Sequence, residues 1–507
     1  MSRLRPWVFF PPFMVLLAAC LYSFVDKDAF LEHASFLNDW ILQYFGWLYS
    51  YATFSFVIIC VVVYFSPLAK IRIGGKNAKP MLSRWRWFSI TLTTTVAVGI
   101  LFWGTAEPLY HLHTPPEGLG IAPNSPEAAT FAMSTMLMHW TITPYAIYTL
   151  AGLMFALTYY NLKQPFSLTA MLYPLLGERA HGKWGKGVDA ICLYSLAAGM
   201  AASLGAGILT IGGGMESLFG MSKTPLLLGL VTMTIVGCFI ISAASGLLKG
   251  IRILANWNIR AFFALCLFVA IFGPTAYMFQ IGGAGTLDYL THYFPRSLHT
   301  LELKDTAWLN SWTIFYWANW LAWTPVTALF LGRLSYGYRV RDYIHFNLLL
   351  PAIFGGFWMV VFSGAALQMD IAAEGTPLYN VLQESGAESI IYAVLDRLPA
   401  PQLMSIVFLL ISFLSYITAA DSNTSAMSGI SSTGISPQSP EPAFGIKLTW
   451  GVTIGIIAWV MVTFAGLEGI KMSSNLGGFP ALFLVIVVAI GMLKLVLKPS
   501  LLQEQED

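Results

Sequence analysis

Aromatic side chains gather in two apolar stretches of this sequence, where together they could bind a methylated cation. The stretch from Ser311 to Trp323, SWTIFYWANWLAW, holds four tryptophans, a tyrosine and a phenylalanine. On a helix, Trp317, Trp320 and Trp323 follow one another every three residues and share roughly a third of the circumference. A second cluster lies in residues 138–148, MHWTITPYAIY. If the two helices meet, their π-faces can hold a quaternary ammonium group, which has no hydrogen to donate.

Membrane anchoring is the alternative explanation for each of these rings. Tryptophan and tyrosine are enriched where helices cross the two membrane interfaces. The sequence leaves both interpretations open for any single tryptophan.

The composition identifies the chain as an integral membrane protein. Of its 507 residues, 57% are apolar and only 10% are charged, which is too hydrophobic for a soluble protein of this size. Runs of about 20 apolar residues predict roughly twelve membrane-spanning helices. The runs lie near residues 7–25, 46–67, 87–110, 129–160, 187–219, 225–245, 259–281, 308–331, 342–368, 402–428, 446–466 and 473–496. The first run has no small-residue cleavage site, so we expect it to be a retained span.

The distribution of positive charge predicts the orientation. With the amino terminus in the cytoplasm, 21 of the 27 lysines and arginines fall in cytoplasmic segments, which supports an even number of spans and two cytoplasmic termini. The five cysteines all lie in apolar runs, and no disulfide, metal, nucleotide or enzyme motif is present. We therefore expect one membrane domain in a lipid bilayer, with no cofactor, no enzyme activity and no nucleic acid partner.

Polar residues inside the predicted spans are further candidates. The third span mixes Thr93 with small residues before Glu107, and such a helix can loosen and turn carbonyls toward an ion or a substrate, although small residues also simply allow close packing. Pro144 should break the fourth span and could aim the aromatic rings around it inward. We interpret His139 as a hydrogen-bonded structural residue. Few carboxylates are expected at mid-membrane depth near the aromatic clusters, so π-faces would have to hold a cation.

The tenth predicted span contains two residues of interest. Thr418 offers a hydroxyl oxygen, which suits sodium, and Asp421 is an intramembrane carboxylate. Because Asp421 is expected near the cytoplasmic side, we predict that it pairs with a basic residue of a loop.

Several motifs together resemble the betaine/carnitine/choline transporter (BCCT) family over nearly the whole chain. They are FWGTAEP at 102–108, MHWTITPYAIY at 138–148, PLLGE at 174–178, GLLKGIR at 246–252, SWTIFYWANW at 311–320 and LGRLS at 331–335. The resemblance implies an all-α fold of about twelve transmembrane helices with a LeuT-like 5+5 inverted repeat preceded by two extra helices. It also implies alternating access, an aromatic box at mid-membrane and frequent assembly as trimers.

On this pattern the single domain, residues 1–507, divides into four parts. Residues 1–86 would form the two extra helices and a loop, 87–281 the first repeat, 308–496 the second repeat and 497–507 a short cytoplasmic tail. The expected location is the cytoplasmic (inner) membrane.

The resemblance also assigns site residues position by position. The box is similar to Trp140, Tyr145, Tyr148, Trp320 and Trp323, and Tyr110 matches a box tyrosine of the carnitine-exchanging members. Two departures matter, because Tyr145 stands where many members have tryptophan and Asn319 replaces the first Trp of a usual pair. Asparagine removes one π-face and adds donors and an acceptor, which suggests a substrate with an extra polar group or fewer methyl groups.

The coupling ion is less completely specified. Sodium-driven members use a Thr-Ser pair with carbonyls of the third span, and here the pair reads Thr418-Ala419, opposite Thr93 and Val96. Methionine, a poor sodium ligand, stands at a second family ion position, Met200. In the exchanging members an arginine replaces one ion, whereas this chain has Asn258, two residues before Arg260.

We therefore predict a secondary transporter of a quaternary ammonium zwitterion, betaine or carnitine-like, with sodium symport through one site ahead of sodium-independent exchange. Uptake of choline, a net cation, is an alternative transport function. A membrane sensor that binds the ligand without moving it is the alternative of a different class.

Overall fold

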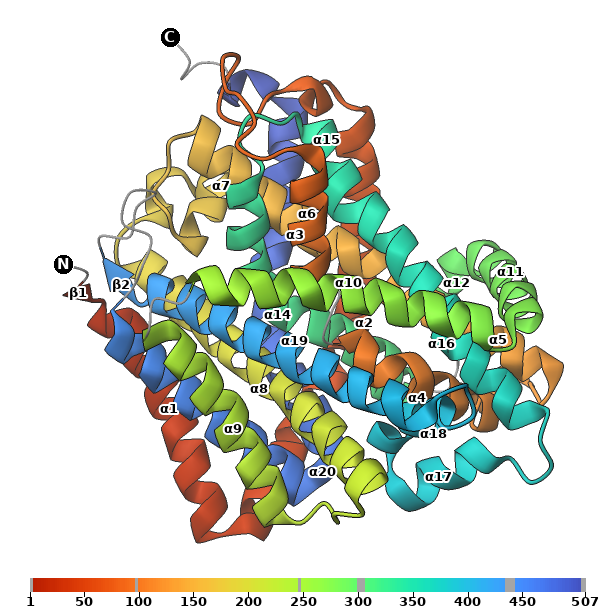
Figure 1. The fold of residues 1–507 in the computed structure, drawn as a ribbon. Helices are drawn as coiled ribbons and strands as arrows, with labels where there is room; N and C mark the ends of the chain where they lie inside the picture. Colours follow the sequence, from red (N-terminus) through yellow and green to blue (C-terminus); the bar gives the residue numbers. More distant parts are fainter. Residues whose placement is uncertain (1–2, 96–98, 245–247, 299–305, 434–442, 503–507) are drawn as a thin grey trace.

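The structure is a computed structural model, and it describes residues 3–95, 99–244, 248–298, 306–433 and 443–502 (Figure 1). The helices are α1 (Pro6–Val25), α2 (Lys27–Phe65), α3 (Arg84–Thr95), α4 (Gly99–His113), α5 (Pro126–Trp140), α6 (Ile142–Ala156), α7 (Tyr173–Leu176), α8 (Lys183–Phe219), α9 (Pro225–Ala244), α10 (Leu248–Phe272), α11 (Thr275–Thr291), α12 (Tyr293–Ser297), α13 (Thr306–Leu309), α14 (Phe315–Leu334), α15 (Val340–Ile344), α16 (Leu350–Ile371), α17 (Pro377–Ser385), α18 (Ile390–Leu395), α19 (Pro401–Ile430) and α20 (Phe444–Leu497). Two short antiparallel strands, β1 (Arg3–Leu4) and β2 (Ser432–Thr433), join the ends of α1 and α19.

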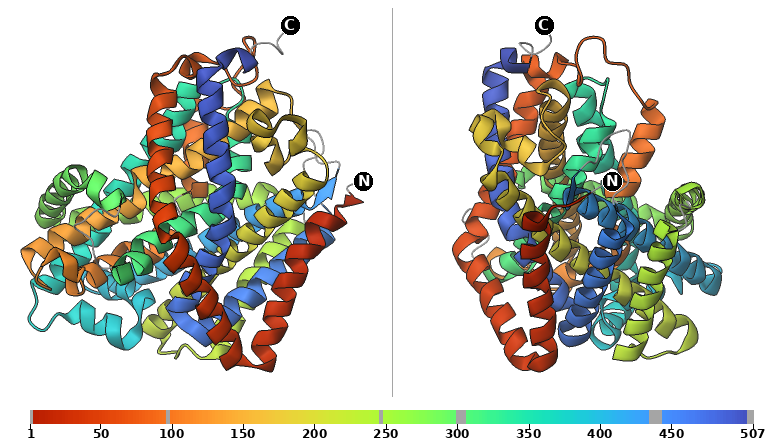
Figure 2. Two further views of the ribbon diagram at one scale, coloured as in Figure 1. Left: turned by 180° about the vertical axis from the view of Figure 1, so that it is seen from behind. Right: turned by 90° about the vertical axis from the view of Figure 1, so that its left-hand side faces the viewer.

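The described part of the chain forms an all-α membrane protein. Seven of its helical stretches are long and apolar enough to cross a bilayer, or up to eight if one bent pair counts as a single span. The twelve-span count and the inverted repeat stay predictions. Helices α2 and α20 run side by side along the molecule (Figure 2), and α8 and α19 lie beside each other (Figure 1).

The long helix α20 explains part of the difference between the twelve predicted spans and the seven or eight found in the described residues. Its 54 residues form two helical parts on either side of a kink and cover the last two predicted runs, 446–466 and 473–496. A straight helix of that length would reach about 80 Å, far more than a bilayer is thick. Gly466, at φ 54°, interrupts the helical backbone and changes its direction between the two runs.

The seventh predicted span, residues 259–281, does not match the helix boundaries. α10 ends at Phe272, and α11 leaves it at an angle of 103°. The Gly273-Pro274 pair causes this bend, because proline removes a backbone donor and restricts the residue before it. α11 therefore lies at the edge of the molecule in Figure 1 and does not continue the span.

Small residues let α8 pack closely against its neighbours. A Cβ atom on Gly199 would lie 2.8 Å from the Cβ of Ala322 on α14, and one on Gly205 would lie 2.7 Å from Val462 on α20. These distances are shorter than real Cβ contacts, so a side chain would push the helices apart. The close approach holds α8 against the helix that carries the Ser311–Trp323 aromatic stretch.

Candidate functional site

A break between α5 and α6 positions the first aromatic cluster. Thr141 has φ −123° and ψ −106°, outside the helical region. Pro144 explains the position, because its ring would clash with the carbonyl four residues earlier, at Trp140. The predicted break is confirmed. Trp140 ends α5, and Tyr145 and Tyr148 lie on the first turns of α6.

Trp320 of α14 is the ring on which this cluster converges. Its centroid lies 5.7 Å from Trp140, 5.5 Å from Tyr145 and 5.0 Å from Tyr148. The interplanar angles of 73°, 64° and 60° are those of edge-to-face or tilted pairs, in which a ring edge meets a neighbouring π-face. The two distant stretches of sequence thus meet in one place.

The converging rings border a cavity, which we call the aromatic cavity, with a volume of about 150 Å³. Its lining residues are Leu92, Gly99, Trp103, Trp140, Tyr148, Ala202, Ser203, Ala206, Asn258, Ile259, Phe262, Phe263, Phe315, Asn319, Trp320, Trp323, Phe354, Ser415, Thr418, Ala419, Ser422, Asn423 and Ile470. None of these residues is charged. A cation in the cavity would therefore meet π-faces, hydroxyls and amides, and no carboxylate directly.

Several predicted site residues line the aromatic cavity: Trp140, Tyr148, Asn319, Trp320, Trp323 and Thr418. Tyr145 is not among the lining residues. It is buried against Trp320, and its hydroxyl has no hydrogen-bond partner among the described residues. Trp317, which the three-residue spacing put on the same face, also lies outside the lining and packs against His139.

Tyr110 belongs to a different cluster. Its ring centroid lies 5.0 Å from Trp312, and the ammonium group of Lys471 lies 4.6 Å from the centroid of the same Trp312 ring. Lys471 and Glu468 line a second, more polar cavity of about 350 Å³. The structure therefore does not bring Tyr110 to the aromatic cavity with Trp320.

Polar side chains line another part of the aromatic cavity. The Nδ2 atom of Asn258 donates to the Ser415 hydroxyl at 2.8 Å, while its Oδ1 atom is buried without a partner among the described residues. The Thr418 hydroxyl donates to the carbonyl of Leu414 at 2.8 Å, which leaves its oxygen lone pairs for a ligand. Val96 lies outside the described residues, and so does the side chain of Thr93.

Asn319 connects the cavity lining to α20. Its amide lies 3.2 Å from the Ser474 hydroxyl, which also lies 3.0 Å from the carbonyl of Ile470. The amide supplies donors and an acceptor on the lining of the aromatic cavity.

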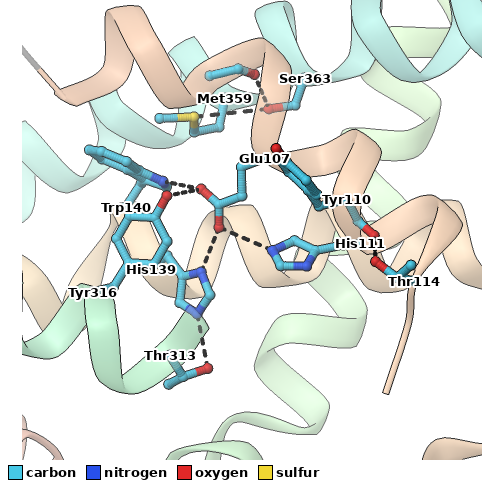
Figure 3. A network of polar contacts seen from close by, with 11 residues as sticks. Glu107, Tyr110, His111, Thr114, His139, Trp140, Thr313, Tyr316, Met359 and Ser363 are labelled. Carbon is cyan, nitrogen blue, oxygen red and sulfur yellow. Dashed lines mark hydrogen bonds and ion pairs between the residues drawn. The ribbon is translucent and has the colours of Figure 1, made fainter. Parts of the chain in front are cut away.

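A buried carboxylate lies beside Trp140 (Figure 3), outside the lining of the aromatic cavity. Glu107 of α4 has no exposed surface. Its Oε2 atom accepts from Trp140 Nε1 at 2.9 Å and from the Tyr316 hydroxyl at 2.5 Å. Its Oε1 atom lies 2.6 Å from His139 Nδ1 and 3.1 Å from His111 Nε2.

A signal for Glu107 is present in its position. An ionisable residue inside a membrane-length run indicates a functional site by default, and Glu107 lies in such a run. Asp421, another such carboxylate, forms an ion pair with Lys447, so the predicted basic partner exists but lies on the first turn of α20 and not in a loop.

The two histidines beside Glu107 raise the question of a metal centre. The ligand atoms of Glu107, His111 and His139 lie within 4.8 Å of one another. However, these atoms already bond to each other, and Oε2 is occupied by Trp140 and Tyr316. His139 also contacts the Thr313 hydroxyl through Nε2 at 3.0 Å, in agreement with the structural role predicted for it. The geometry favours a hydrogen-bond network over a metal site.

Similarity to known proteins extends over nearly the whole chain. A family model described as "BCCT, betaine/carnitine/choline family transporter" matches residues 7–500. The glycine betaine transporter OpuD of Bacillus subtilis is 29% identical over 95% of this chain and 92% of its own length. Glycine betaine transporter 1 of Vibrio parahaemolyticus is 32% identical over 85% of this chain and 81% of its own length. The high-affinity choline transport protein of Escherichia coli is 27% identical over 97% of this chain and 72% of its own length.

Proposed function

The chain belongs to the betaine/carnitine/choline transporter family, and we propose that it carries a quaternary ammonium zwitterion, betaine or carnitine-like, by alternating access. Family membership makes it a multi-pass membrane transporter and not an enzyme. The aromatic cavity is the proposed substrate site, with Trp140, Tyr148, Trp320 and Trp323 as its π-faces.

The main support for this proposal is the convergence of aromatic rings on Trp320. Trp320 lies within 5.7 Å of Trp140 and within 5.0 Å of Tyr148, beside a cavity without charged lining residues. Such a box suits a permanent cation with no hydrogen to donate. The amide of Asn319 and the hydroxyl of Ser203 can donate to a carboxylate on the same small molecule, which favours a zwitterion, and the Thr418 oxygen can accept from a hydroxyl group.

A binding panel tests the substrate class. Glycine betaine, carnitine, choline and dimethylglycine would be titrated against the purified protein, and binding of at least one trimethylammonium compound is expected. Asn319→Trp restores the family pair and should raise the preference for glycine betaine over dimethylglycine, because it replaces amide donors by a π-face. An unchanged preference would remove Asn319 from the account of selectivity.

Choline uptake has a specific observation in its favour, since one of the relatives is named a choline transport protein. Choline carries net charge, so its electroneutral uptake is impossible without a counter-movement. At the same sodium stoichiometry, uptake of choline by proteoliposomes should therefore move one more positive charge per molecule than uptake of a zwitterion, which a parallel measurement of charge and solute flux detects.

Sodium symport is the proposed coupling. Thr418 and the unpartnered Oδ1 atom of Asn258 supply hard oxygen ligands on the lining of the aromatic cavity. Uptake by proteoliposomes, measured in sodium and in potassium buffer, distinguishes sodium symport from sodium-independent exchange. Uptake that disappears in potassium supports symport, whereas uptake that persists and is stimulated by internal substrate supports exchange. Ligand binding without any flux would support the sensor.

The proposal includes the finer architecture: twelve spans, the inverted repeat, a homotrimer in the inner membrane and cytoplasmic termini. The sharp bend before α11 leaves Phe279, Leu287 and Leu290 exposed, which is consistent with a helix that meets lipid or a second subunit. Native mass spectrometry in detergent measures the subunit number, and cysteine labelling in intact cells measures the side on which each terminus lies.

A further inference from the structure

The Glu107 network places a negative charge next to the aromatic cavity. Its four contacts come from Trp140, Tyr316, His111 and His139, which lie on α4, α5 and α14 (Figure 3). A carboxylate has about four lone-pair positions, and these four groups can each supply one N–H or O–H donor. The network is therefore complete when the carboxyl group is ionised.

The geometry around His111 fits a neutral ring. His111 uses Nε2 to reach Glu107, and its Nδ1 atom is buried with no partner among the described residues. A positively charged His111 would bury an unpaired N–H group, which is costly. No lysine or arginine of the described part of the chain contacts Glu107; Lys471, nearby, lies over Trp312 and pairs with Glu468.

A buried carboxylate in a membrane span that no described lysine or arginine contacts is expensive and usually has a function. Here one hydrogen bond connects it to the cavity. Trp140 donates its indole N–H to Glu107 and lines the aromatic cavity with the rest of its ring. A hydrogen bond to an anion polarises the donor, so the indole becomes more electron-rich and its π-face attracts a cation more strongly.

We propose that Glu107 is the counter-charge of the substrate's ammonium group and a positioning residue that acts through Trp140. This inference rests on the proposed function, because it needs a cation in the aromatic cavity. The Nε1–Oε2 distance of 2.9 Å, together with a cation within about 6 Å of the ring, puts the two charges roughly 8 Å apart. At an effective dielectric constant of about 20, that attraction corresponds to roughly a thirty-fold change in Kd.

The test compares two ligands of the same shape that differ in one charge. Glycine betaine and tert-butylacetate differ only in having nitrogen or carbon at the trimethyl centre. Their Kd values would be measured by calorimetry with wild type, Glu107→Gln and Tyr316→Phe. We expect wild type to prefer glycine betaine and Glu107→Gln to lose about thirty-fold of that preference. Tyr316→Phe disturbs the same network but keeps the carboxylate, so it should keep the preference.

An equal loss of affinity for both ligands in Glu107→Gln would overturn the proposal, because a purely structural role weakens the site without regard to ligand charge. Absence of quaternary ammonium binding in wild type would instead overturn the proposed function.

A second pair of variants keeps the test decisive if Glu107→Gln does not fold. Trp140→Phe and Trp320→Phe make the same change at two cavity rings, but only Trp140 donates to Glu107, and Trp320 Nε1 has no partner among the described residues. Trp140→Phe should lose more of the preference for glycine betaine than Trp320→Phe. Equal losses would contradict the role of Glu107.

Discussion

Replacing Trp320 by alanine removes the ring that Trp140, Tyr145 and Tyr148 all contact. A desolvated cation–π contact contributes about 2 kcal/mol, which corresponds to roughly a thirty-fold increase in Kd for a trimethylammonium substrate. The ring also keeps the other three in place, at centroid distances of 5.0 to 5.7 Å. We therefore expect a loss of at least this size.

Trp317 provides a matched control on the same helix. It is as deeply buried as Trp320, with exposed fractions of 1% and 4%, but it does not line the aromatic cavity. Truncating either tryptophan leaves a void and should destabilise the protein by about 3–5 kcal/mol. The two variants should thus lose similar stability, while only Trp320→Ala should lose affinity.

The assay is a titration of each purified variant with glycine betaine, accompanied by a thermal unfolding curve. Trp320→Phe, which keeps a π-face, should fall between wild type and Trp320→Ala. If Trp320→Ala binds as tightly as wild type, or if Trp317→Ala weakens binding equally, the aromatic cavity is not the site that we describe.

Three further predictions concern packing, the amino terminus and the coupling ion. Gly478→Ala should lower the melting temperature, because the added methyl group would collide with the backbone of α14, whereas Gly237→Ala has open space and should raise it slightly. Arg5→Ala should destabilise the protein by about 3 kcal/mol in denaturant titrations, since it removes the partner of the fully buried Asp189 carboxylate; Arg5→Lys should lose less, because a positive charge remains. If transport is sodium-coupled, Ala419→Ser should lower the sodium concentration needed for half-maximal uptake, and no change would indicate that this position holds no ion.

A break in a helix can be predicted from the sequence where a single residue causes it. Pro144 predicts the break next to Trp140 from sterics alone. The bend at Gly273-Pro274 could have been predicted by the same reasoning, but a continuous apolar run obscured it. The boundary between the last two predicted runs, 446–466 and 473–496, agrees with the structure, where the non-helical backbone of Gly466 separates the two parts of α20.

The site was predictable only in part, because spacing along a helix does not say which neighbour a side chain meets. Trp317 and Trp320 share a face in projection, yet Trp317 packs against His139 while Trp320 meets the α5–α6 rings. Tyr110 packs against Trp312, and Lys471 lies over the same Trp312 ring. These residues are far apart in the sequence, so no local pattern encodes their contacts. The resemblance to a family, more than periodicity, identified the converging rings.

Because the helix is interrupted at Thr141, the position of Trp140 at the aromatic cavity depends on Gly355 of α16. The carbonyl of Trp140 stands against Gly355 of α16, where an added Cβ would lie only 2.7 Å from that oxygen. Any larger residue there would have to shift the end of α5, and the indole would shift with it. Substitutions of Gly355, which does not line the aromatic cavity, can thus change substrate selectivity. Searches for selectivity mutations should therefore extend to α16.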